Sequence, residues 1–333
     1  MTSITNRVLK IPFFALATFG IVLAVACGSS ATATLAPPPT SAPADPTAIT
    51  PILATTVLEV GEQRLAFLLT TTKGLIKAPT ALVTPANLDG DGAPGETLEA
   101  QFNLWPYGIR GSYSAYVNFD RAGRWRLDVQ VDNPEGVDQV QIEVEVMERS
   151  PVPALGSIAP LSITKTLEGK GDIAKVTTDY TPDPGLYQLT IKEAVENPLP
   201  SVVVFASPAF CTSPTCGPQV DTVSELKDAY RGRANFIHVE IYDNPDEIQG
   251  DLERAEIFSV VDDWGLTSIE DYFNESWTFI MDADGQILDR FEGFATLKEL
   301  EAALLQALPP GIGRRGQPTI DRRVRPRVIL DRR

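Results

Sequence analysis

Two cysteines, Cys211 and Cys216, lie where a predicted strand is followed by a predicted helix. The strand is the apolar run Val202–Ala206, whose length suits a buried strand. The helix is predicted over 219–231, because apolar side chains recur there at helical spacing. A helix N-terminus offers free N–H groups and a partial positive charge, and both favour a thiolate over a thiol. The sequence therefore places two thiols where their ionisation is favoured.

The N-terminal residues 1–26 have the pattern of a secretory signal peptide. Arg7 and Lys10 give a basic start, and the apolar run 11–26 follows. That run is short for a transmembrane helix, which needs about 20 apolar residues. Cys27, at the expected cleavage position, resembles the lipidated cysteine of bacterial lipoproteins, which implies a lipid anchor on the outer face of the cytoplasmic membrane, in the cell envelope. An ordinary cleaved signal and an uncleaved anchor are the alternatives, and all three export the chain.

The spacing of the other two cysteines leaves open how they pair. On a regular helix, residues five apart are about 8–9 Å from each other, which exceeds the roughly 4.4–6.8 Å that separates the Cα atoms of a disulfide. Pro214 allows Cys211 to lie in a loop before the helix, and closure is then possible. Outside the cytoplasm such a pair can persist as a disulfide, so we expect a Cys211–Cys216 bond.

Two segments are too poor in apolar residues to form a core. Residues 27–50 are mainly Ser, Ala, Thr and Pro, and we expect a tether. Residues 309–333 carry eight arginines and two aspartates, and we expect a disordered basic tail that is solvated or touches anionic lipid. The whole chain has a net charge of −16 and no basic patch in its body, which excludes nucleic acid as a partner.

Residues 51–149 are predicted to be all-β. Apolar and polar side chains alternate along Ser112–Phe119 and Gln141–Val146, and turns rich in Gly, Asn and Asp separate the strands. About seven short strands with regular turns favour an immunoglobulin-like β-sandwich. The predicted strands are 56–60, 64–71, 80–84, 98–103, 112–119, 125–131 and 139–146.

The pattern changes after a connector, residues 150–200, in which a short helix is predicted at 189–195. Strands then alternate with helices. Asp284 and Gly285 between two apolar runs predict a hairpin. Thr296 with Glu299 three residues later predicts a capping box. The predicted elements are a strand at 234–241, a helical stretch at 249–264, hairpin strands at 277–282 and 286–291, and a helix at 296–308.

This order of elements, with a cysteine pair after the first strand, resembles the thioredoxin fold over residues 150–308. Gly156–Pro160 is similar to the opening of exported thioredoxin-like proteins of the TlpA and ResA type. The resemblance implies a three-layer α/β/α domain and thiol–disulfide exchange with exported protein thiols or disulfides, without a cofactor. Two positions depart from the family. The pair has C-x4-C rather than C-x-x-C spacing, and Ser276 lies before the late hairpin, where the family has a cis-proline.

Three functions remain open for the cysteine pair. In an oxidoreductase one thiolate attacks and the other thiol resolves the mixed disulfide. We expect Cys211 to attack, although Cys216-Gly217-Pro218 resembles the start of the thioredoxin signature and would make Cys216 the attacker. The chain also resembles Sco-type copper-site assembly factors, in which the copper(I) ligands would be Cys211, Cys216 and His238. The third possibility is a non-catalytic interaction module with a structural disulfide.

The remaining polar candidates are given structural roles. His238 is the only histidine and falls inside a predicted strand, so we expect a core or edge residue rather than a ligand. Asp221 and Glu240 could approach the thiols, but we expect both to be solvated at the surface. A single histidine in such a strand also excludes a Ser/His/Asp hydrolase.

Overall fold

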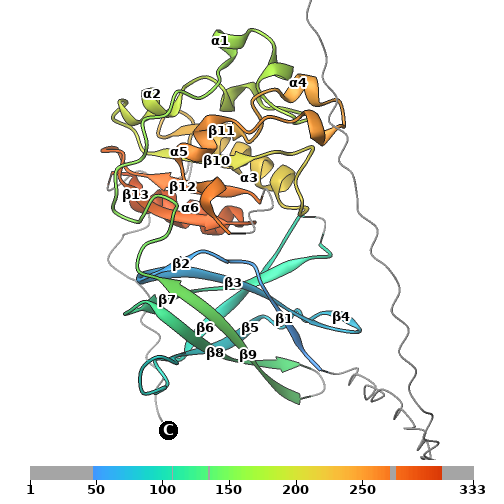
Figure 1. Ribbon diagram of the computed structural model, residues 1–333, viewed down its shortest axis with the longest axis vertical. Helices are drawn as coiled ribbons and strands as arrows, with labels where there is room; N and C mark the ends of the chain where they lie inside the picture. The colour runs from blue at the N-terminus through green and yellow to red at the C-terminus, as the bar shows by residue number, and fades with distance from the viewer. Residues whose placement is uncertain (1–47, 107, 134–135, 271–274, 310–333) are drawn as a thin grey trace, which may run out of the picture. The chain divides into compact units, whose positions relative to one another are not determined.

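The structure is a computed structural model that describes residues 48–106, 108–133, 136–270 and 275–309. These residues form a mixed α/β fold with a large curled sheet, followed along the chain by a smaller sheet with helices (Figure 1). All of them belong to one compact unit that begins at Asp45. The expected signal peptide, Cys27, nearly all of the tether and the tail beyond residue 309 lie outside the described residues. In the described ranges, no helix is long and apolar enough to cross a membrane.

The large sheet contains all seven strands predicted between residues 51 and 149, together with two short strands that were not predicted, β1 and β4. β1 begins at Thr50, inside the expected tether. The strands run in the order β1-β3-β7-β6-β5-β8-β9-β2, with β4 beside β3. Their bounds are β1 Thr50–Leu53, β2 Leu58–Glu59, β3 Gly61–Thr71, β4 Gly74–Leu75, β5 Thr80–Asn87, β6 Leu98–Leu104, β7 Gly111–Phe119, β8 Gly123–Asn133 and β9 Gly136–Met147.

We expected two separate sheets here, as in a sandwich, but the described strands hydrogen-bond along one continuous path. The reason lies at Gly61. β2 ends at Glu59 and pairs with β9, whereas β3 begins at Gly61 and pairs with β7 at the other side of the sheet. Gly61 has φ +116°, a conformation that glycine adopts readily. One bent stretch of chain therefore joins both sides, and the sheet curls around a core that includes Phe67, Tyr113 and Leu127.

The small sheet is built around the predicted apolar run after residue 200. Its strands are β10 (Ser201–Ala206), β11 (Asn235–Glu240), β12 (Trp277–Met281) and β13 (Ile287–Glu292), in the order β11-β10-β12-β13. β10 and β11 are parallel, because α3 (Cys216–Ala229) crosses between them. β12 and β13 form the predicted antiparallel hairpin. The hairpin turn uses Gly285 with φ +77°, and a Cβ there would lie 2.6 Å from the Val195 side chain.

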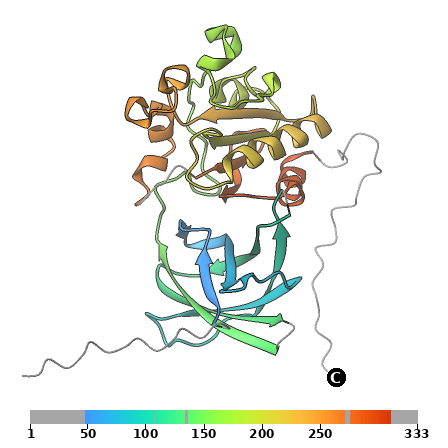
Figure 2. The ribbon, with the colours of Figure 1, turned by 90° about the vertical axis from the view of Figure 1, so that its right-hand side faces the viewer.

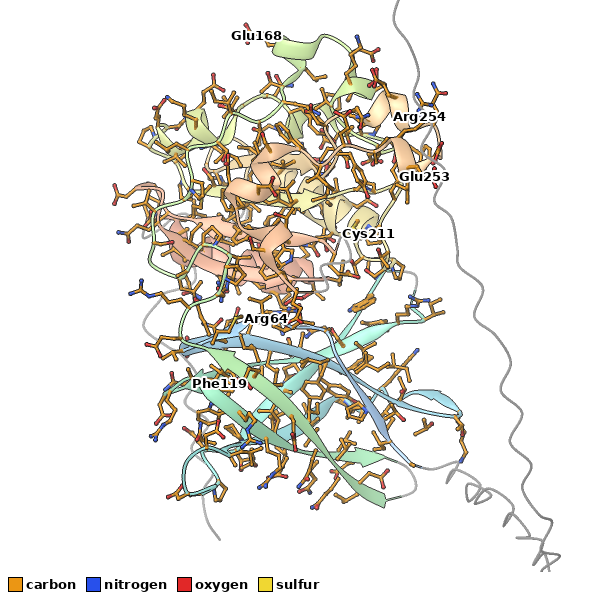
Figure 3. All side chains as sticks on the ribbon, viewed as in Figure 1. Arg64, Phe119, Glu168, Cys211, Glu253 and Arg254 are labelled. Atoms are coloured by element: carbon orange, nitrogen blue, oxygen red, sulfur yellow. A yellow bond between two sulfur atoms is a disulfide. The ribbon has the colours of Figure 1, made fainter. Side chains whose placement is uncertain are left out.

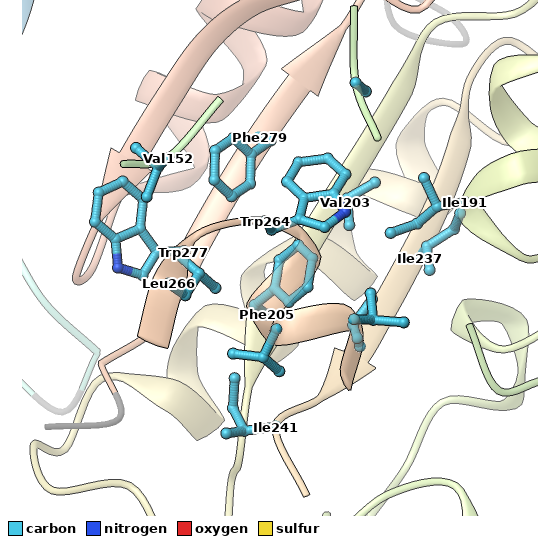
Figure 4. Packing of buried hydrophobic residues seen from close by; sticks show 14 of the residues in the cluster. Val152, Ile191, Val203, Phe205, Ile237, Ile241, Trp264, Leu266, Trp277 and Phe279 are labelled. Carbon is cyan, nitrogen blue, oxygen red and sulfur yellow. The ribbon is translucent and has the colours of Figure 1, made fainter. Parts of the chain in front are cut away.

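Both faces of the small sheet are buried. One face is covered by α3 and α6 (Leu297–Ala307) (Figure 2). The apolar side chains of these helices pack with Val202 and Val204 of β10. On the other face Phe279 packs edge to face against Phe205 and Trp264, and Trp277 stacks on Phe279 (Figure 4). The shorter helices are α1 Leu167–Lys170, α2 Ile191–Val195, α4 Pro245–Ile248 and α5 Ser259–Asp263, with 3-10 turns at Ile173–Lys175, Pro184–Leu186, Leu252–Arg254 and Leu266–Ser268.

Three of the predicted helices can be compared with the structure. The capping box of α6 is present, with Thr296 and Glu299 exchanging hydrogen bonds. α3 begins at Cys216, three residues before its predicted start. The helical stretch predicted at 249–264 is wrong as one helix, because Ala255 and Phe258 have extended backbone and Ile257 forms an antiparallel bridge with Tyr242. Extended residues interrupt a helix, so only short turns and α5 form there.

Buried ion pairs join the large sheet to the small sheet and its helices. Arg64 of β3 pairs with Glu299 of α6 at 2.9 Å, with side-chain exposures of 2% and 14% (Figure 3). Arg290 of β13 pairs with Glu59 of β2 at 3.2 Å, and both side chains are also buried. The Glu292 carboxylate accepts the Thr56 N–H at 2.7 Å. The two parts of the fold are therefore joined by charged contacts that are largely buried.

Candidate functional site

The predicted disulfide is present between Cys211 and Cys216. The Cα atoms are 5.9 Å apart, within the usual range for such a bond. Cys216 is the first residue of α3, whereas Cys211 lies in the preceding loop. Because the two cysteines do not share a helix, their separation of five residues can be closed. This arrangement answers the question that the spacing alone left open.

The two sulfurs of the disulfide have different surroundings. Cys216 is fully buried, at 0% exposure, and packs in the apolar core under α3. Cys211 is half-buried at the edge of the same core (Figure 3). A partner molecule can therefore approach Cys211 and not Cys216.

A polar cluster lies beside Cys211. The hydroxyl oxygens of Ser213 and Thr215 are each 4.0 Å from the Cys211 sulfur. These hydroxyls are 2.7 Å from each other. Thr215 donates to Glu275 Oε2 at 3.0 Å, and Ser213 donates to the same oxygen. We call Ser213, Thr215 and Glu275 the hydroxyl–carboxylate cluster.

The hydroxyl–carboxylate cluster is not apparent from the sequence. Glu275 is 60 residues from Thr215 along the chain, and no motif links the two. One signal was available, because Glu275 directly precedes Ser276, the position at which the thioredoxin family has its proline. Ser276 is fully buried, donates to the Gly293 carbonyl at 3.1 Å and lies 3.4 Å from the Thr215 hydroxyl. Glu275 and Ser276, directly before β12, thus lie beside the loop that holds the cysteines, although none of the described peptide bonds is cis.

A pocket of about 530 Å³ lies beside the loop between the two cysteines. Ser213, Pro214, Thr215 and Glu275 line one side of it. The large sheet and its loops supply a mostly apolar wall that includes Ile52, Leu53, Leu68, Leu75, Trp105 and Ile109. We call this space the disulfide pocket. A ligand in it would touch apolar side chains and the polar groups next to Cys211 together.

Glu240 was expected to be solvated, and the structure contradicts that expectation. Its side chain is buried at the end of β11, where Thr178 covers the carboxylate. The Thr178 N–H and hydroxyl both donate to Glu240 Oε2 at 2.7 Å. Burial raises the pKa of Glu240 above its ordinary value, against these hydrogen bonds. Asp221 is exposed on α3, as expected.

His238 lies in the core, as expected from its place in a strand, and is 1% exposed. Its Nδ1 accepts from the Tyr187 hydroxyl at 2.7 Å, and its Nε2 is 3.0 Å from the Ala206 carbonyl, to which it donates. Both ring nitrogens are therefore engaged. Within the described residues, no group of three or more His, Cys, Asp or Glu side chains is arranged to hold a metal ion. The structure does not bring Cys211, Cys216 and His238 together as a ligand set.

Burial lowers the pKa of His238 to about 4, although the Ala206 carbonyl favours the charged form. Because His238 is the only histidine, an NMR pH titration of its ring protons reports this one group. We expect a midpoint near pH 4. In an unfolded chain the midpoint would lie near pH 6.5, so folding loses stability as the pH falls from about 6.5 toward 4. A midpoint at or above pH 6 would contradict the burial and hydrogen bonding of this ring.

Comparisons with known proteins add little to this geometry. No family model matches the chain, and no curated protein matches it. Among solved structures, the chain is similar to one described as the crystal structure of an engineered protein. The two are 14% identical, and the match covers 31% of this chain and 21% of that chain with a TM-score of 0.22. Likeness at that level carries no argument, so the site must be interpreted from its own residues.

Proposed function

We propose that this chain is an exported thiol–disulfide oxidoreductase of the thioredoxin-like class, in which Cys211 attacks and Cys216 resolves. The observation that carries the proposal is the asymmetry of the disulfide. One sulfur is accessible from a loop, and the other is buried at the first residue of a long helix. Exchange proteins need that asymmetry, because the partner must reach one sulfur while the second waits beneath it. Export and lipid anchoring at Cys27 belong to the proposal on sequence grounds.

The reaction conserves atoms and electrons. In the reduced protein the Cys211 thiolate attacks one sulfur of a partner disulfide, the partner S–S bond breaks, and the departing partner thiolate takes a proton from water. The Cys216 thiol then loses its proton and attacks the Cys211 sulfur. That step releases the second partner thiolate and forms the Cys211–Cys216 bond. Two electrons have passed to the partner, and the reverse sequence oxidises a partner dithiol.

The small sheet supports the thioredoxin-like part of the proposal. A parallel pair joined by a helix, followed by an antiparallel hairpin and a helix on the same face as the first, is the connectivity that the family shares. The cysteines stand at the start of α3, where the family has its reactive pair. The immunoglobulin-like assignment of residues 51–149 stays a prediction, and the proposal does not use it.

The disulfide pocket supports a protein as the partner. Its apolar wall comes from the large sheet, and its other side is the loop between the cysteines. A partner segment with apolar residues beside its own cysteine could bury them there while its sulfur meets Cys211. This would also give the large sheet a role in selecting the partner.

An equilibrium redox titration of the full chain tests the proposal. The protein is poised across glutathione and dithiothreitol potentials, and the alkylated Cys211 and Cys216 peptides are counted by mass spectrometry. We expect a reversible two-electron step between about −120 and −270 mV, the span of known exchange proteins. A pair that stays oxidised well below about −300 mV would behave as a structural disulfide, and the proposal would fail.

The full burial of Cys216 also favours a second candidate, a non-catalytic module in which the disulfide only secures the start of α3. The redox titration separates the two candidates. A copper(I) role would have to use the two thiolates alone, because both ring nitrogens of His238 are occupied. Copper binding would become the next experiment if the two cysteines never formed a disulfide in solution.

A further inference from the structure

Glu275 places a carboxylate at the disulfide, although disulfide exchange requires no carboxylate there. Its Oε2 accepts the Thr215 hydroxyl at 3.0 Å and also accepts the Ser213 hydroxyl. Both hydroxyl oxygens lie 4.0 Å from the Cys211 sulfur. A hydroxyl has one proton and two lone pairs. The two hydroxyls also lie 2.7 Å apart, so each proton goes either to Glu275 or to the other hydroxyl, and only lone pairs are left to face Cys211.

The other charged groups around the disulfide pocket do not offset the negative charge of Glu275. Glu292, at the end of β13, lines the pocket, but its carboxylate accepts the backbone N–H groups of Thr56 and Val57. Burial raises the pKa of Glu292, and the negative charge of Glu275 adds to that effect. Among the described residues that line the same pocket, Arg110 is the one cation. It lies on the wall formed by the large sheet and its loops, and its side chain is exposed. An exposed cation is screened by water and offsets little of a nearby charge.

We propose that Glu275 holds Cys211 in its thiol form once the disulfide is reduced, and so sets the pH at which this site becomes reactive. The inference rests on the proposed function only in that a reduced Cys211 must occur. Two effects act in the same direction. The hydroxyl lone pairs accept an S–H proton but repel an S⁻ charge, and the carboxylate opposes a second negative charge close to it. Glu275 touches no reacting atom, so it is a positioning residue.

The test is a pH profile of Cys211 alkylation in the reduced full chain. Wild-type protein and the Glu275→Gln variant react with iodoacetamide at a series of pH values, and mass spectrometry measures the rate at Cys211. We expect the half-maximal rate of Glu275→Gln to lie about one pH unit lower, because the amide is uncharged and frees the hydroxyl protons for the sulfur. Glu168→Gln, at an exposed residue of α1, is the matched control and should leave the profile unchanged (Figure 3).

A second variant separates the hydroxyl contribution from charge and from folding. Thr215 is buried, and valine has nearly the same shape without the hydroxyl. Adding Thr215→Val to Glu275→Gln should reverse part of the downward shift, because one donor to the thiolate is lost. A pH profile that is unchanged or moves upward in Glu275→Gln overturns the proposal. A downward shift that persists in full after Thr215→Val overturns the part of the proposal that assigns an effect to the Thr215 hydroxyl.

The result of the alkylation profile does not depend on the result of the redox titration that tests the proposed function. A downward shift in Glu275→Gln, with a pair that stays oxidised in the redox titration, would leave this inference standing and remove the oxidoreductase. Reversible exchange with no shift in Glu275→Gln would do the opposite.

Discussion

Replacing Cys216 with alanine is expected to trap Cys211 as a mixed disulfide with glutathione in nearly every molecule of the variant. After reduction and addition of glutathione disulfide, the accessible Cys211 thiolate attacks and forms the mixed disulfide. The resolving thiol is absent, so the adduct persists. Wild-type protein should instead pass through the adduct and end as the Cys211–Cys216 disulfide. Intact-mass measurement under non-reducing conditions, with fragmentation to locate the adduct, distinguishes the two.

Cys211→Ala is the matched control for this trapping experiment. Both variants lose the same short covalent loop, whose contribution to stability is about 2 kcal/mol in the chain-entropy model. Any difference between them therefore reports reactivity rather than folding. Cys216 is fully buried, so Cys211→Ala should stay unmodified. An adduct on Cys216 and none on Cys211 would reverse the two roles, and no adduct on either would favour the structural disulfide.

Glu299→Gln is expected to lower the free energy of unfolding by about 3 kcal/mol. Arg64 is 2% exposed, and its ion pair with Glu299 joins β3 of the large sheet to α6. The variant keeps the size of the side chain but removes the ion-pair partner of a buried guanidinium. Removing one partner of a buried pair typically costs about 3–5 kcal/mol, because the remaining charge stays out of water. Chemical denaturation at neutral pH measures the loss.

Asp120→Asn is the control for charge removal alone. Asp120 pairs with Arg121, and more than half of each side chain is exposed, so we expect a change below about 1 kcal/mol in the free energy of unfolding.

The pH dependence of stability gives a further check on the Arg64–Glu299 pair. Burial would raise the pKa of Glu299, but the charge of Arg64 brings it below its ordinary value. The pair therefore stabilises the fold above about pH 4.5 and loses that effect as the pH falls further. Equal losses of stability in Glu299→Gln and Asp120→Asn would contradict a buried ion pair.

Much of the local structure follows from patterns of a few residues. The late hairpin formed as predicted around Asp284 and Gly285, because a turn signal lies between two apolar runs. The capping box at Thr296 formed because both of its partners lie within one helical turn. The helical stretch 249–264 failed because the chain is extended at Ala255 and Phe258, where Ile257 forms a bridge with Tyr242, and periodicity does not report such a contact.

The candidate site could likewise be predicted from the sequence only in part. The position of the cysteines at a strand-to-helix junction could be predicted, because both lie within a few residues of the elements that hold them. Their closure into a disulfide was expected from the number of thiols in an exported chain, but the geometry that permits it depends on α3 starting at Cys216 rather than before it. Glu240 was assigned to the surface because a lone acid usually is solvated, and its burial depends on Thr178, which is 62 residues away in the chain.

The sequence by itself determined most of the strands and helices, the pairing of Cys211 with Cys216, and the place of His238 inside a strand. Those features depend on side-chain periodicity, turn residues and the number of thiols, all of which are local or countable. Only the tertiary structure decided that the large sheet curls into one path, that Arg64 meets Glu299, and that Glu275 reaches the hydroxyls beside Cys211. Each of these depends on a contact between distant segments, and such contacts are chosen by the packing of the whole fold rather than by any pattern within one segment.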